Sequence, residues 1–106
     1  MRHIVWAEMA AEDLREVIVW LLDRDAAGAA RSLLADVDRR ITRLEEFPES
    51  GRVVPELARE GITRYREVIV DVWRVLYTVT AENITVLAFI DSRRNIEDIL
   101  LYRGIR

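Results

Sequence analysis

The apolar residues of this chain change their spacing once, and that change restricts the possible folds more than any other feature. Over residues 7–44 they recur at every third or fourth position, as on the buried face of an amphipathic helix. From residue 64 to residue 90 the chain instead carries strand-like runs of β-branched and aromatic residues. A helical half followed by a strand half is typical of α+β domains. We therefore expect helices that pack on a mainly antiparallel sheet.

The expected elements follow one another in the order β-α-α-β-β-β-α. They are a strand at 2–6, a helix from Ala7 to the polar break at Asp23–Asp25, a second helix that Pro48 ends, a loop at 48–61, strands at 64–70, 72–80 and 84–90, and a short helix from about Asn95 to Gly104. The connection between the two long helices is short, so they should form an antiparallel hairpin that packs on the sheet. No Gly or Asn marks the turn around Asp71, and the register of the strands beside it stays open.

The length of 106 residues suits one domain, which we expect to span residues 1–106. Its core should come from the apolar stripes of the two long helices and from the inward faces of the strands. The residues expected to be largely buried are Leu14, Ile18, Leu21, Leu34, Val37, Ile41, Leu44, Val75, Tyr77, Leu87 and Phe89.

The composition excludes several kinds of chemistry. All 16 basic residues are arginine, cysteine is absent, and His3 is the only histidine. A catalytic amine is excluded because guanidinium stays protonated, and thiolate chemistry has no residue to perform it. We therefore expect no metal site and no cofactor. The lack of cysteine, of a secretion signal and of a long apolar segment favours a cytoplasmic protein without a membrane partner.

Two adjacent arginines, Arg93 and Arg94, stand where the last strand run gives way to the C-terminal helix. Cations are disfavoured there because the helix dipole is positive at its N-terminal end. One explanation is local pairing with the carboxylates of Asp91, Glu97 and Asp98, which would form a solvated cluster of little energetic value.

The other explanation is a binding patch. Arg64, Arg66 and Arg74 alternate with apolar residues in the strand runs, so one sheet face could carry them beside Arg93 and Arg94. Such a patch would bind protein carboxylates or nucleic-acid phosphates equally well. The sequence alone supports both explanations.

Four sequence segments, taken in order, resemble the RelE/ParE superfamily of toxins from type II toxin–antitoxin operons. They are "AAEDLREVIVWL" in the first helix, "FPESGRVVPEL" after the second, "YREVIVDVWRVLYTV" across the central strands, and "SRR" after the last strand. Together these segments span nearly the whole chain. The fold that the resemblance implies, an antiparallel sheet covered by an N-terminal helical hairpin, agrees with the order of elements expected above.

The resemblance implies one of two mechanisms. RelE-like members cut mRNA on the ribosome without metal, usually with several lysines and arginines and a late Tyr or His, whereas ParE-like members poison DNA gyrase. This chain has no lysine and no histidine after His3. Because arginine cannot act as a general base, an RNase would have to recruit Glu67, Asp91, Glu97 or Tyr102.

The "GRVVPEL" loop and the double arginine are more similar to the ParE-like branch. We therefore expect a toxin that inhibits DNA gyrase by protein–protein binding, with Arg66, Arg74, Arg93 and Arg94 as target-binding residues and no catalytic residue assigned. The alternative is a ribosome-dependent mRNA endonuclease that is independent of metal and uses Arg66, Arg74 and Tyr102. Under the first expectation the chain is not an enzyme. Under the second, its partners are the ribosome and mRNA.

The resemblance also implies a cognate antitoxin, encoded nearby, whose acidic or amphipathic tail masks the toxin in a hetero-oligomer. It further implies a role in plasmid stabilisation. Val19 and Trp20 lie away from the centre of the apolar stripe of the first helix, so its apolar face is wider than one neighbour needs. Burial between the second helix and the sheet would explain them. The alternative explanation is a groove for an antitoxin helix.

Overall fold

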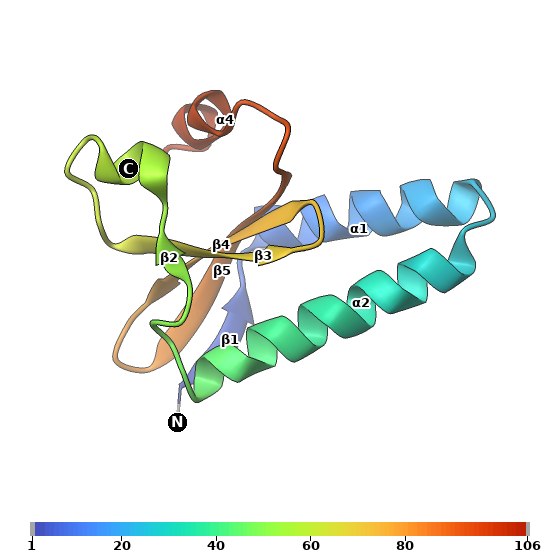
Figure 1. Cartoon of the computed structure of the whole chain (residues 1–106), viewed down its shortest axis with the longest axis horizontal. Coiled ribbons are helices and arrows are strands. Elements are labelled where there is room, and N and C mark those ends of the chain that lie inside the picture. Colours follow the sequence, from blue (N-terminus) through green and yellow to red (C-terminus); the bar gives the residue numbers. More distant parts are fainter. Residues whose placement is uncertain (1, 106) are drawn as a thin grey trace.

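A computed structural model describes residues 2–105, and Figure 1 shows the path of the chain. The elements are β1 (His3–Trp6), α1 (Glu8–Asp23), α2 (Ala27–Thr42), the single 3₁₀ turn η1 (Arg43–Glu45), β2 (Arg52–Val53), α3 (Pro55–Ala58), β3 (Tyr65–Val70), β4 (Trp73–Val79), β5 (Asn83–Asp91) and α4 (Ile96–Tyr102). The expected order β-α-α-β-β-β-α is confirmed. Within the expected loop at 48–61 the structure adds β2 and α3. None of the helices in the described part of the chain is long and apolar enough to cross a membrane.

The five strands form one sheet in the order β1-β5-β4-β3-β2. β1 runs parallel to β5, and the other neighbours are antiparallel. The turn between β3 and β4 has Asp71 in the left-handed region, at φ 54°, which Asp tolerates better than most residues. Val70 consequently pairs with Trp73, and this pairing sets the register that the sequence left open.

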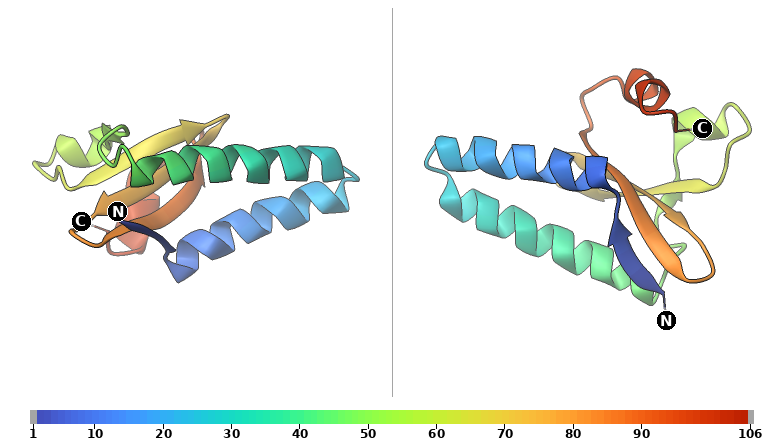
Figure 2. Two further views of the ribbon diagram at one scale, coloured as in Figure 1. Left: turned by 90° about the horizontal axis from the view of Figure 1, so that it is seen from below. Right: turned by 180° about the vertical axis from the view of Figure 1, so that it is seen from behind.

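The helical hairpin of α1 and α2 covers one face of the sheet, and its tip projects beyond the sheet edge (Figures 1 and 2). The backbone turns between the helices at Asp25, which lies in the left-handed region at φ 56°. Under the hairpin lies the larger apolar cluster, which includes Val37, Ile41, Val75 and Phe89. The hairpin is therefore the main cover of the core, as expected.

The opposite face of the sheet is covered by α3 and α4, a second cover that the sequence did not predict. These short helices contribute Leu57, Ile96 and Leu100 to a second apolar cluster, together with Leu76 and Ile90 from the sheet. The sheet thus buries apolar residues on both faces. Figure 1 shows α3 and α4 side by side, away from the hairpin.

Most of the expected core residues are buried, and the exceptions have structural reasons. The confirmed residues are Val37, Ile41, Leu44, Val75, Tyr77 and Phe89. Leu14, Ile18 and Leu21 are only half-buried because much of α1 extends past the sheet. The prediction that Leu34 is buried is wrong. Its neighbour Leu33 is buried, and Leu34 lies one position further around α2 with 44% of its surface exposed.

Leu87 is also only half-buried, because the ladder between β4 and β5 shifts register beside it. Leu76 pairs with Ala88, yet the next residue, Tyr77, pairs with Val86. Leu87 is the extra residue of this β-bulge, so Val86 takes the inward position that simple alternation gives to Leu87.

The loop before β2 is fixed by Tyr77. Its hydroxyl donates to the Pro48 carbonyl at 2.8 Å and accepts from the Gly51 amide at 3.0 Å. A Cβ at Gly51 would lie 2.5 Å from that hydroxyl and from the Glu67 carbonyl, so only glycine fits. Burial raises the pKa of the Tyr77 phenol, which keeps the donor protonated.

Candidate functional site

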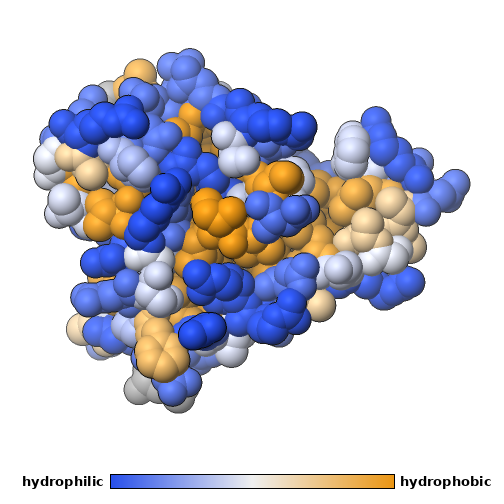
Figure 3. Space-filling view, in the orientation of Figure 1, coloured by the Kyte–Doolittle hydropathy of each residue, from blue (hydrophilic) through white to orange (hydrophobic). Residues whose placement is uncertain are grey.

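A groove of about 700 Å³ lies where the helical hairpin meets the β3–β4 turn and the end of β5. Its lining includes Val17, Trp20 and Leu21 from α1 and Leu33 from α2. Figure 3 shows apolar surface running from the middle of the molecule onto the hairpin, with hydrophilic side chains along its borders. A concave surface with an apolar lining and a charged rim is the usual form of a binding site.

Aromatic side chains form the sheet side of the groove. The rings of Trp73 and Phe89 stack with centroids 5.1 Å apart. Phe89 is buried, Trp73 is half-buried, and the turn residue Val72 is exposed beside them. Stacked rings hold each other in place, and the groove therefore presents a rigid apolar wall.

Trp20 stands on the opposite wall with 53% of its surface exposed. The guanidinium carbon of Arg24 lies 4.0 Å from the centre of its ring, which is a cation–π contact. Val19 is similarly exposed but does not line the groove. Of the two residues expected to bind an antitoxin, the structure thus places Trp20 in the groove and Val19 outside it.

Arg93 forms an ion pair with a residue close to it in the sequence, Asp91. Its Nε donates to Oδ1 of Asp91 at 3.0 Å, its Nη2 donates to Oδ2 at 2.6 Å, and its backbone amide also donates to Oδ1 at 2.9 Å. The side-chain hydrogen bonds from Arg93, followed by the backbone one, lower the pKa of the Asp91 carboxyl to about 2. For Arg93 the explanation by local pairing is confirmed.

Arg94 differs from its neighbour. Its backbone amide donates to the Asp91 carbonyl at 3.1 Å, but within residues 2–105 its exposed guanidinium forms neither a hydrogen bond nor an ion pair. The groove is therefore lined by one paired arginine and one whose charge is available to a ligand.

Arg93 and Arg94 do not destabilise the helix that follows them. α4 begins at Ile96, and Asn95 caps it by accepting a hydrogen bond from the Asp98 amide at 3.2 Å. Glu97 and Asp98 occupy the first turn, where acids suit the helix dipole. Arg93 and Arg94 precede this cap, so the conflict expected from the sequence does not arise.

Asp13 lines the groove and connects three parts of the chain. Its carboxylate accepts from Nη1 and Nη2 of Arg103 at 2.7 and 2.6 Å and from the Phe89 amide at 3.0 Å. Hydrogen bonding to Asp13 raises the pKa of Arg103. Because Asp13 lies 90 positions from Arg103, no local pattern in the sequence predicted this contact.

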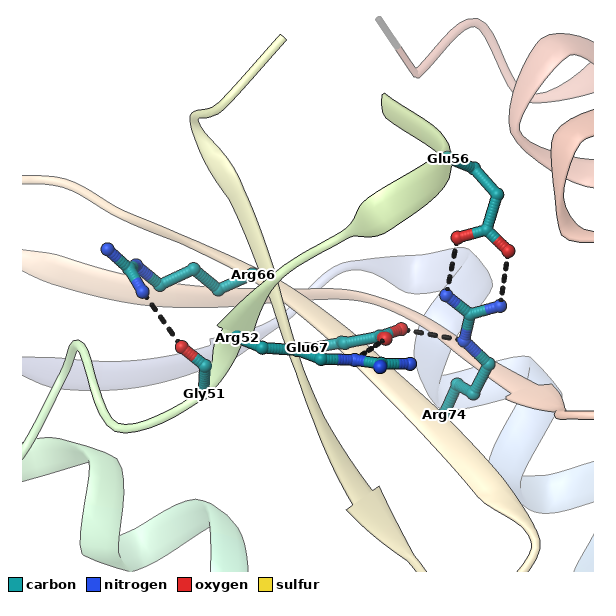
Figure 4. Close-up of polar contacts among 6 residues, drawn as sticks. All are labelled: Gly51, Arg52, Glu56, Arg66, Glu67 and Arg74. Carbon is teal, nitrogen blue, oxygen red and sulfur yellow. Dashed lines mark hydrogen bonds and ion pairs between the residues drawn. The ribbon is translucent and has the colours of Figure 1, made fainter. Parts of the chain in front are cut away.

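Arg66 and Arg74 do not share a face of the sheet, so the expected arginine-bearing face is wrong. Arg66 pairs with Tyr77, whereas Arg74 pairs with Ile69, three positions further along β3. Side chains an odd number of positions apart on a strand point to opposite faces. Figure 4 shows Arg66 turned toward the Gly51 carbonyl, to which it donates at 2.8 Å, and away from Arg74.

Arg74 lies in a buried network of alternating charges (Figure 4). It donates to both carboxylate oxygens of Glu56 at 2.8 Å and through Nε to Glu67 at 2.7 Å, and Arg52 donates to the other oxygen of Glu67 at 2.6 Å. Glu67 is 1% exposed. Hydrogen bonding to Glu56 raises the pKa of Arg74, and hydrogen bonding from Arg74 lowers the pKa of Glu56 to about 2.

The residues named for an RNase are not brought together. Tyr102 is 88% exposed on α4, while Arg74 is enclosed by its two glutamates, and no hydrogen bond within residues 2–105 joins the two side chains. Among the candidate bases, Glu67 and Asp91 are held by arginines, and Glu97 lies 3.9 Å from Arg59 on the surface. Within the described residues no group of His, Cys, Asp or Glu is arranged to hold a metal ion.

Comparisons with known proteins agree with this architecture. The family model described as "ParE toxin of type II toxin-antitoxin system, parDE" matches residues 4–96. A solved structure described as "Chromosomal ParDE TA system from P. aeruginosa" superposes with a TM-score of 0.68 at 16% identity, over 86% of this chain and 96% of that one. No curated protein matches the chain. The extent of the family match shows that the chain belongs to the ParE toxin family of type II toxin–antitoxin systems.

Proposed function

We propose that this chain is a cytoplasmic toxin that inhibits DNA gyrase by protein–protein binding and that a cognate antitoxin neutralises it. The observation that carries the proposal is the groove, whose lining combines Trp20, the stacked pair Trp73 and Phe89, and the unpaired Arg94. An aromatic-lined groove with an available arginine has the composition of a protein-binding hot spot. Arg93 and Arg94 are its proposed target-binding residues: Arg94 through its unpaired guanidinium, and Arg93 by holding the turn that carries Arg94.

The distribution of arginines favours binding over RNA cleavage. Cleavage without metal requires a general base and free cations around one phosphodiester. Arg74 is paired with Glu56 and Glu67, and Arg66 points to the other face of the sheet. Tyr102 is exposed and forms no hydrogen bond with either arginine within residues 2–105. These positions support the gyrase proposal over a RelE-like endonuclease.

The antitoxin is proposed to bind the same side of the hairpin. Trp20 lines the groove and Val19 extends the exposed apolar surface just outside it. Burial of this surface by a partner would remove apolar area from water and stabilise a toxin–antitoxin hetero-oligomer. A role in plasmid stabilisation follows if both genes lie on one plasmid.

Induction of the chain in a host with a reporter plasmid tests the proposal. We expect gyrase trapped on DNA, altered plasmid topology and a DNA-damage response, with an abundant transcript left uncut in primer extension. The double change Arg93→Ala and Arg94→Ala should weaken toxicity, because a desolvated charge pair at an interface costs about 2–5 kcal/mol when broken. Ribosome-dependent cuts in the transcript with unaltered topology would sink the gyrase proposal.

The matched control is Arg39→Ala, which removes an exposed arginine of α2 that does not line the groove. Exposed arginines contribute little to folding, so the control and the double variant should melt near the wild-type temperature. Equal loss of toxicity in both would mean that the groove arginines have no special role.

A further inference from the structure

The groove unites two surfaces that the sequence analysis treated as separate. Trp20 was expected to bind an antitoxin, and Arg93 and Arg94 were expected to bind a target. All three residues line one groove. A partner that covers Trp20 and reaches the stacked rings of Trp73 and Phe89 therefore approaches the arginines as well.

The charges around the groove specify the occupant further. Asp13 is neutralised by Arg103, and Asp91 is neutralised by Arg93. Three charged residues of the lining, Arg94, Glu16 and Asp71, have no ion pair within residues 2–105. The groove consequently offers one cation and two anions beside an apolar wall. A purely acidic tail would meet repulsion from the anions, whereas an amphipathic segment with charges of both signs fits.

The two adjacent arginines also differ in what they can give a partner. Arg93 already donates three hydrogen bonds to Asp91 and thereby holds the turn between β5 and α4. Arg94 has both edges of its guanidinium unused. Arg93 keeps one edge free, but Asp91 already balances its charge. An incoming carboxylate therefore gains a full charge pair at Arg94 and not at Arg93.

We infer that the groove takes an amphipathic segment of the antitoxin that places an apolar side chain between Trp20 and Trp73 and a carboxylate on Arg94, and that this segment excludes the target from the same cation. This inference rests on the proposed function and names the partner chemistry and the mode of neutralisation at that site. Neutralisation is direct competition for Arg94. Arg93 acts as a positioning residue that fixes the turn.

The first experiment measures binding of the antitoxin encoded beside the gene to purified variants by calorimetry. Arg94→Glu should weaken binding at least about tenfold, because a favourable charge contact becomes a repulsive one. Arg39→Glu makes the same charge change outside the groove and should bind within about twofold of wild type. Unchanged affinity of Arg94→Glu would overturn the inference.

A double-mutant cycle identifies the chemistry of the contact. Each acidic residue beside the apolar stripe of the antitoxin is changed to its amide and tested against wild type and Arg94→Ala. One such change should weaken binding to wild type and have little further effect on Arg94→Ala. If every amide variant weakens both to the same extent, no carboxylate sits on Arg94. Arg94→Ala removes only an exposed side chain, and its melting curve checks that it is folded.

The second experiment tests exclusion on immobilised gyrase. The chain alone should bind, and the preformed complex with the antitoxin should not. A ternary complex would overturn the shared groove while leaving gyrase as the target. Failure of the chain alone to bind gyrase would overturn the proposed function itself, and competition for Arg94 with it. Arg94→Glu should weaken gyrase binding too, and full-strength binding by that variant would assign the two partners to different surfaces.

Discussion

At the scale of single residues, the network of Arg52, Glu67, Arg74 and Glu56 has the clearest energetic consequence (Figure 4). Arg74 and Glu67 are buried, and each depends on the other and on one further partner. Removal of one member of such a network leaves its partner charged and desolvated, which costs more than the network itself contributes.

This dependence predicts acid sensitivity. The pKa of Glu56 is lowered from 4.5 to about 2, so its contribution to stability is full above about pH 4.5 and is lost as the pH falls toward 2. From this group we expect the free energy of unfolding to fall by on the order of 2 kcal/mol across that window. Urea denaturation at several pH values between 7 and 2 measures the fall.

Glu56→Gln should lower stability at pH 7 and make its acid dependence shallower. Glu60→Gln is the control, because Glu60 is exposed and has no ion pair within the described residues. Parallel acid curves for wild type and Glu56→Gln would show that the network does not set the acid response.

The sequence identified the arginines but could not pair them. Arg74 was expected to face a ligand, yet it faces Glu56 and Glu67. Its orientation depends on the register set at Asp71 and on the position of α3, neither of which has a strong local signal. The pairing of Arg93 with Asp91 was predictable because the two residues are two positions apart.

At the scale of elements, α2 shows how one helix face divides between core and solvent. Ile41 is 3% exposed, while Leu34 on the same helix is mostly outside the core. We expect Ile41→Ala to lower the free energy of unfolding by about 2–5 kcal/mol through lost burial and a residual cavity. Leu34→Ala should cost less than about 1 kcal/mol. Chemical denaturation of both variants checks this, and equal losses would mean that the face of α2 is misassigned.

The long elements were predictable and the short ones were not. The stripes of α1 and α2 span several helical turns, so their period is readable from the sequence. β2 has two residues and α3 has four, which is too short for any period to appear. The bulge that displaces Leu87 also has no marker such as glycine in the sequence around it.

At the scale of the whole molecule, the groove combines residues of the helical hairpin with residues of the β3–β4 turn and the end of β5. The hairpin projects past the sheet (Figure 2). The sequence indicated that α1 has too wide an apolar face. It could not indicate which segment faces it, because that depends on how the hairpin docks. The contribution of Trp73 and Phe89 to the wall was therefore missed.

The exposed apolar wall predicts that the isolated chain depends on its partner for solubility. Trp20, Val72 and Val19 leave apolar surface in water that an antitoxin would cover, and such surface promotes self-association.

Cell-free synthesis separates this effect from toxicity to a host. We expect a higher soluble yield when the antitoxin is synthesised with the chain, and size-exclusion chromatography should show larger assemblies without it. Trp20→Ser should reduce this dependence, whereas Leu101→Ser should not, because Leu101 is similarly exposed but does not line the groove. Equal soluble yields with and without the antitoxin would show that the exposed apolar groove does not limit the solubility of the chain.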